Sequence, residues 1–194
     1  MMPRRTLERG VTMLEVLITI FIVSFGMLGL AGLQARMLLA QVEAYQRAQA
    51  ITILKNMSTR LHAAHPTTSA ARDAYVTATP KGTGVGLQSC TNLVGAALDL
   101  CEWNNALVGA SETSGGASVG AMIGARGCIE SASVDPPYVF KVSVVWQGMA
   151  DTITPASTTC GSGSYGSTSK RRALIATVTV ACFNNDTVTG ACIP

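Results

Sequence analysis

The stretch LERGVTMLEVLITIFIVSFGMLGLAGLQAR, residues 7–36, places one carboxylate, Glu15, at the start of a long apolar run. The next 20 residues, 16–35, carry no charged side chain. As a helix they would rise about 30 Å, at about 1.5 Å per residue, which is enough to cross the hydrocarbon core of a bilayer. An ionisable group beside lipid is costly, so Glu15 is a candidate functional residue.

The composition limits the classes of function. The chain has 194 residues, enough for one domain with a hydrophobic core beyond the apolar run. Its net charge of +3 is small, and Arg4, Arg5 and Arg9 lie before the run. Because the basic excess lies mostly in this leader, the charge balance indicates neither a nucleic-acid-binding domain nor one for acidic substrates.

All six cysteines follow the apolar run, and none belongs to a Cys-x-x-Cys pair. An even number of cysteines behind an export-type N-terminus is typical of disulfides formed in an oxidising compartment. Zinc-type spacing of cysteine and histidine is missing, so we expect no metal site and no cofactor. Of the 15 pairings open to six cysteines, we favour the sequential one: Cys90 with Cys101, Cys128 with Cys160, and Cys182 with Cys192.

Three interpretations of the N-terminus are open. A secretory signal peptide has a basic start, an apolar stretch and a cleavage site after small residues, and residues 29–31 would serve as that site. A plain membrane anchor would keep the whole segment. The third interpretation uses Gly10 and Glu15 together.

The string RGVTMLEV, residues 9–16, resembles the class III signal of type IV prepilins. In that family a membrane peptidase cuts after a glycine that ends a short basic leader. The new first residue is N-methylated, and glutamate is the fifth residue of the mature protein. The resemblance implies cleavage between Gly10 and Val11, methylation of Val11, and a role in assembly for Glu15.

The amino group of Val11 and the carboxylate of Glu15 would lie four residues apart, on one helix face. Each charge is expensive in lipid when alone and much less so when paired. In the family the glutamate is thought to meet the N-terminal amine of a neighbouring subunit. The resemblance therefore implies that Glu15 sets the register of subunits during assembly.

Further segments, taken in their order, resemble the PilV kind of minor pilin, a type IV pilus modification protein. They are FGMLGLAGLQ (25–34), RGCI (126–129), VVWQG (144–148), CGSGSYG (160–166) and the arginine pair 171–172. Pseudopilins of type II secretion systems share the N-terminal signal and remain the alternative family.

No proline follows the apolar run until Pro66, so we expect one helix from about residue 12 to residue 61. Two apolar stripes occur at helical spacing, and we interpret both as core packing. The first consists of Leu38, Val42 and Tyr45, and the second of Ala50, Leu54, Met57 and Leu61. We expect His62 and His65 to be exposed at the helix end, where cationic side chains suit the helix dipole.

The rest of the chain predicts turn-rich β structure. Two β-branched and aromatic runs, residues 138–146 and 173–183, predict an antiparallel pair of strands. The loop 151–170 has 13 Gly, Ser or Thr among its 20 residues, so it needs a tether, and Cys160 is well placed for that. A second Gly-rich stretch, residues 109–127, predicts a surface loop followed by a short strand.

The predicted fold class is α+β: a pilin-like long N-terminal helix, membrane-spanning in its lower half, packed on a small antiparallel β-sheet and braced by disulfides. We expect a leader peptide at residues 1–10 and a transmembrane assembly helix at 11–35. An amphipathic continuation would follow at 36–65, and a β-rich periplasmic or extracellular domain at 66–194.

The segment GSGSYGSTSK, residues 161–170, does not match a phosphate-binding P-loop. A P-loop has a lysine and then Ser or Thr directly after its last glycine, whereas Gly166 is followed by Ser167 and Thr168. Lys170, Arg171 and Arg172 would form a surface basic patch able to touch DNA or another negatively charged surface. Three charges at the start of a strand are also typical of a solvated edge that discourages aggregation.

We discern no Ser/His/Asp or Cys/His set of the kind that serves catalysis. We therefore expect a non-enzymatic minor pilin. It would support pilus assembly or initiation, adhesion and twitching motility, with DNA uptake as a further role. Its expected partners are major and other minor pilins, prepilin peptidase and the inner-membrane assembly platform. We expect a single-pass inner-membrane protein that then enters a surface pilus of a Gram-negative-type bacterium. The alternatives are a type II secretion pseudopilin and a membrane-tethered periplasmic binding or enzymatic domain.

Overall fold

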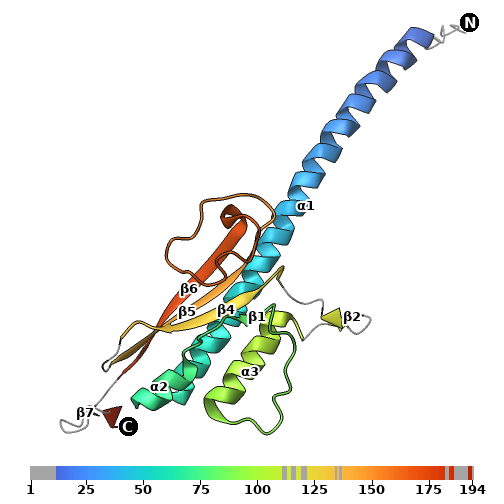
Figure 1. Cartoon of the computed structure of the whole chain (residues 1–194). Helices are drawn as coiled ribbons and strands as arrows, with labels where there is room; N and C mark the ends of the chain where they lie inside the picture. Colours follow the sequence, from blue (N-terminus) through green and yellow to red (C-terminus); the bar gives the residue numbers. More distant parts are fainter. Residues whose placement is uncertain are drawn as a thin grey trace, which may run out of the picture. The chain divides into compact units, whose positions relative to one another are not determined.

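A computed structural model describes residues 12–110, 113–114, 117–118, 122–133, 135, 137–181, 184–185 and 192–193. The chain divides into two compact units, Met1–Val42 and Glu43–Pro194. Helix α1, Met13–Ala64, is the longest element (Figure 1).

The end of α1 follows from local chemistry. His65 has a φ of +42°, and its N–H still donates to the Leu61 carbonyl at 3.2 Å. Pro66 comes next, and the residue before a proline is disfavoured in a helix. The predicted helix is confirmed, and it ends at Ala64, slightly later than expected.

The last part of α1 supplies one side of the core of the second unit. Its buried residues recur at helical spacing and are Gln46, Ala50, Ile53, Leu54, Met57 and Leu61. The second predicted stripe is therefore confirmed. The first is wrong as core packing, because Leu38, Val42 and Tyr45 are exposed by 62%, 43% and 52%. The buried face of α1 begins only at Gln46, which leaves the earlier stripe at the surface.

The main sheet has four antiparallel strands in the order β1-β4-β5-β6. They are β1 (Lys81–Gly82), β4 (Arg126–Ser131), β5 (Tyr138–Gln147) and β6 (Arg171–Val180). The register of the longest pair sets Trp146 opposite Arg172. The predicted strand pair and the short strand near Cys128 are thus confirmed, as is the α+β fold class.

The two faces of the sheet are covered by different parts of the chain. Because side chains alternate along a strand, Val144 and Trp146 join the main core with α1, and Val145 faces the other way. The loop 151–170 covers that second face, where it contributes two members of a small buried cluster. The cluster consists of Cys128, Val145, Cys160 and Tyr165.

Helix α3, Gly95–Val108, occupies a segment for which the sequence predicts turn-rich β structure, and that prediction is wrong. Gly95 has a φ of +58°, and the N-cap residue Val94 makes no side-chain cap. The usual start signal, a Ser, Thr, Asp or Asn, is therefore missing. The helix end is conventional, with Gly109 in the left-handed conformation at a φ of +82°.

Trp103 of α3 joins the helix to both of its neighbours. The side chain is fully buried, and its indole N–H donates to the Ile53 carbonyl of α1 at 3.2 Å. Its ring lies over Gly127 of β4, where an added Cβ would come within 2.4 Å of the ring atom Cη2. Glycine at this position therefore permits the close approach of α3 to the sheet.

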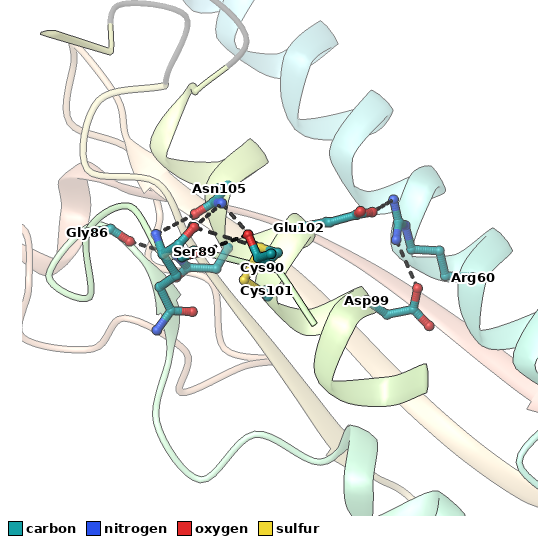
Figure 2. Close-up of a disulfide and its surroundings, with 11 residues drawn as sticks. Arg60, Gly86, Ser89, Cys90, Asp99, Cys101, Glu102 and Asn105 are labelled. Carbon is teal, nitrogen blue, oxygen red and sulfur yellow. Dashed lines mark hydrogen bonds and ion pairs between the residues drawn. A yellow bond between two sulfur atoms is a disulfide. The ribbon is translucent and has the colours of Figure 1, made fainter. Parts of the chain in front are cut away.

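One face of α3 also holds the loop that precedes it (Figure 2). Cys101 forms a disulfide with Cys90 of this loop. The side-chain amide of Asn104 bonds the backbone of Gly82 in β1 and of Gly86 in the loop, and that of Asn105 bonds the backbone of Gln88 through both of its ends, at 2.7–2.9 Å. These bonds hold the main chain of the loop against α3.

The remaining elements are short. They are α2 (Ser69–Tyr75), the pair β2 (Thr113–Ser114) and β3 (Ala117–Ser118), the 3-10 turn η1 (Thr168–Lys170), and the pair β7 (Asn184–Asn185) and β8 (Cys192–Ile193). Helix α2 begins with a side-chain cap, because Thr68 accepts a hydrogen bond from the Ala71 N–H at 3.1 Å.

Candidate functional site

The candidate site predicted at the N-terminus begins in the first turn of α1. Glu15 lies in this turn, and its N–H donates to the Thr12 carbonyl at 3.0 Å. A carboxylate at a helix N-terminus interacts favourably with the helix dipole. Gly10 and Val11, the predicted cleavage pair, lie outside the described residues, so cleavage and methylation there remain predictions.

The helix after Glu15 is apolar on every side. Each described residue from 12 to 42 is exposed, including the large side chains Leu17, Phe21 and Leu28 at 64%, 64% and 73%. A helix that is hydrophobic all round needs an apolar surrounding, either lipid or neighbouring protein. By length and composition, α1 could cross a membrane.

The two hydroxyl groups of this apolar segment are satisfied within the helix. Thr19 Oγ1 donates to the Val16 carbonyl at 2.8 Å, and Ser24 Oγ donates to the Ile20 carbonyl at 2.7 Å. A hydroxyl that is already bonded costs much less in lipid than a free one. Glu15 therefore stands out, since it is the one charged side chain described between residues 12 and 35.

The predicted basic patch is wrong for two of its three residues. Arg171 is only 5% exposed, and its guanidinium donates to the carbonyls of Pro155, Thr158 and Cys160. Arg172 forms an ion pair with Glu43. The long loop before these arginines supplies most of their hydrogen-bond acceptors. The charges in the sequence alone therefore could not predict whether these side chains lie at the surface.

Two of the three expected disulfides are present. Cys90 is joined to Cys101 and Cys128 to Cys160. The third expected pair, Cys182 with Cys192, lies outside the side chains that the structure describes. The second bridge anchors the loop 151–170 to β4, and Arg171 anchors the same loop to β6, a contact that the sequence analysis missed.

A polar cluster links α1 to α3 in the second unit (Figure 2). Arg60 forms ion pairs with Asp99 at 2.8 Å and with Glu102 at 2.6 Å. Asp99 also accepts a hydrogen bond from the Tyr75 hydroxyl at 2.6 Å. Burial and this bond raise the pKa of Tyr75 well above its usual range. The cluster positions no nucleophile, so we interpret it as structural.

The two histidines near the end of α1 differ in exposure. His62 is exposed, as predicted, whereas His65 is half-buried and its Nε2 lies 3.1 Å from the Ala181 carbonyl. In the described part of the chain, no group of three or more His, Cys, Asp or Glu side chains is placed to hold a metal ion.

A family model described as the prokaryotic N-terminal methylation motif matches residues 5–31. The match spans the predicted cleavage pair, Glu15 and most of the apolar run. No curated protein matches the chain, and no solved structure matches it. The motif supports a type IV pilin-like or pseudopilin-like protein, a class of structural subunits rather than enzymes that is processed by a prepilin peptidase and assembles with other pilins.

Proposed function

We propose that the chain is a minor pilin, a low-copy subunit incorporated into a type IV pilus. One observation carries the proposal. The methylation motif at residues 5–31 runs into a single helix, Met13–Ala64, that is apolar on all sides at its start and forms the core of a disulfide-braced domain at its end. Such a chain has one part for lateral packing and another for display.

The mechanism starts in the inner membrane. The basic leader stays on the cytoplasmic side, the apolar run inserts, and the peptidase cuts between Gly10 and Val11. Methylation of the Val11 amine follows. The methylated amine retains its positive charge, so Glu15 of one subunit can pair with the amine of its neighbour inside the apolar core of the fibre.

The partners follow from this mechanism. They are major and other minor pilins, the prepilin peptidase and the assembly platform of the inner membrane. After assembly the domain from Glu43 onward would be displayed on a surface pilus, where it would support pilus initiation, adhesion and twitching motility. A subunit of this kind needs no catalytic site of its own.

A pseudopilin of a type II secretion system is the second candidate, because the matched motif lies within the part that the two classes share. A membrane-tethered periplasmic binding or enzymatic domain is the candidate from a different class. N-methylation of Val11 distinguishes the membrane-tethered domain from the other two candidates, because only a pilin or a pseudopilin requires it.

Mass spectrometry of the mature N-terminus tests the proposal. We expect N-methylated Val11 in the native protein and an intact leader in Gly10→Leu, because the peptidase must approach the backbone closely at glycine. Gly26→Leu, a matched change within the apolar run, should still be processed. A mature end near Gly32, or a retained leader in the native protein, would contradict the proposal. Recovery from sheared pili then separates the pilin from the pseudopilin.

A further inference from the structure

Arg171, the first residue of β6, is a buried cation held entirely by neutral groups. Its Nη1 donates to the carbonyls of Thr158 at 2.8 Å and Cys160 at 2.7 Å, and its Nη2 donates to the carbonyl of Pro155 at 2.9 Å. Its Nε is also buried and has no hydrogen-bond partner among the described residues. The carbonyls satisfy three donors and supply partial negative charge, but among the described residues no full negative charge is paired with the guanidinium.

No described carboxylate forms an ion pair with Arg171. The ion pairs found in the described part of the chain belong to Arg60, Arg72, Lys141 and Arg172. A buried charge without an opposite charge is costly, and buried ions in proteins are normally paired. The surroundings of Arg171 therefore favour an anion.

A second cation strengthens this local field. The Nε of Arg126, on β4, is likewise buried without a partner. Burial raises the pKa of Tyr165 to about 12, and the positive charges of Arg126 and Arg171 act against that rise. Both guanidinium groups thus lie close enough to the Tyr165 hydroxyl to affect it.

A small cavity of about 20 Å³ adjoins Arg171. Its lining consists of Gly163, Tyr165, Gly166, Ser167, Thr168 and Arg171. One water-sized sphere needs roughly 10–15 Å³, so the cavity has room for a single small atom or ion. Gly163 and Gly166 have φ values of +76° and +70°, the left-handed conformation from which anion-binding backbone nests are built. The side chains of Tyr165, Ser167 and Thr168 add hydroxyl groups to the lining.

We propose that this cavity binds one monatomic anion, with chloride as the physiological ligand, beside the Arg171 guanidinium. The anion neutralises the buried charge and fixes residues 163–168 against β6. Chloride thereby stabilises the loop that covers the second face of the sheet.

Thermal unfolding of the full chain in neutral detergent tests the proposal, with chloride titrated against gluconate at constant ionic strength. Gluconate is a much larger anion than chloride and supplies the same ionic strength. We expect the midpoint to rise by about 3–5 °C for each tenfold increase in chloride above the dissociation constant. Arg171→Gln should abolish this dependence, whereas Lys170→Gln, the same charge change at the adjacent residue, should keep it.

If Arg171→Gln fails to fold, Ser167→Ala and a crystal grown with bromide replace it. We expect a weaker chloride dependence in Ser167→Ala and a bromide anomalous peak within contact distance of the Arg171 side chain. Equal midpoints in chloride and gluconate would overturn the proposal and leave water as the occupant. Loss of the dependence in Lys170→Gln would overturn it as well, since general screening would then explain the effect.

Discussion

Glu43 on α1 and Arg172 on β6 lie 129 residues apart in the sequence and form an ion pair in which Nε is 2.6 Å from Oε1. The remaining nitrogens of Arg172 donate to Ala150 at 2.8 Å and to Thr152 and Ser169 at 2.7 and 3.2 Å. This one side chain therefore ties the helix to both ends of the loop 151–170.

Replacing Glu43 by glutamine should lower the free energy of unfolding by about 1–2 kcal/mol, between the values typical of exposed and buried ion pairs. The Arg172 and Glu43 side chains are 13% and 33% exposed, which justifies the intermediate figure. A double-mutant cycle with Arg172→Gln, followed by urea unfolding, measures the coupling. Glu102→Gln, which breaks a more exposed pair, serves as the control and should cost less. Zero coupling between Glu43 and Arg172 would refute the assignment.

Gly127→Ala should destabilise the domain by about 1–3 kcal/mol, the usual cost of overpacking a core. The added methyl group would meet Trp103 at 2.4 Å and Leu107 at 2.7 Å. Gly26→Ala, whose Cβ meets nothing within 4 Å, is the matched control. Thermal melts of both variants check the contrast, and an unchanged midpoint in Gly127→Ala would show that α3 packs differently.

The two disulfides should differ in their contribution to stability. Chain entropy assigns about 4 kcal/mol to the bridge between Cys128 and Cys160, which closes 32 residues, and about 3 kcal/mol to the bridge between Cys90 and Cys101, which closes 11. Urea unfolding of each double alanine variant measures both. Asn104 and Asn105 still hold the loop of the shorter bridge, so its removal should also disturb the domain less. A reversed order would contradict this account.

Stability should decline in alkali as Tyr165 titrates. Burial raises the pKa of Tyr165 from 10.0 to about 12, against the opposing charges of Arg126 and Arg171. The folded state holds the proton more tightly, so this contribution is complete below about pH 10 and is lost as the pH rises toward 12. Urea midpoints across that range should fall less steeply in Tyr165→Phe than in the native protein.

The sequence predicted those elements whose signals are local and periodic. The proline-free run and the apolar spacing from Ala50 to Leu61 indicate α1, and the β-branched runs indicate β5 and β6. Helix α3 was missed because it starts at a left-handed glycine without a capping side chain. Its buried Trp103 and Asn104 find partners that are distant in the sequence.

For the candidate site residues, too, local sequence patterns could be predicted and contacts between distant residues could not. The matched methylation motif, residues 5–31, includes Gly10, Val11 and Glu15, and a motif with fixed spacing can be recognised in one sequence. The basic triplet failed because burial of Arg171 and pairing of Arg172 depend on a loop and a helix that only folding brings together. Charge in a sequence indicates neither burial nor partners.

Glu15→Ala tests whether Glu15 pairs with the N-terminal amine of a neighbouring subunit. The variant keeps Gly10 and the apolar run, so it should be inserted and cut normally. It would then leave a buried amine without its partner, at a cost of about 3–5 kcal/mol, a hundredfold or more in the assembly equilibrium. Thr19→Ala, which removes a polar group bonded within the same helix, is the control.

Immunoblots of the inner-membrane fraction and of sheared filaments measure the outcome. We expect Glu15→Ala to accumulate in its processed form in the membrane and to be missing from filaments, while Thr19→Ala reaches filaments at native levels. Equal recovery of Glu15→Ala and native protein in sheared filaments would contradict this pairing.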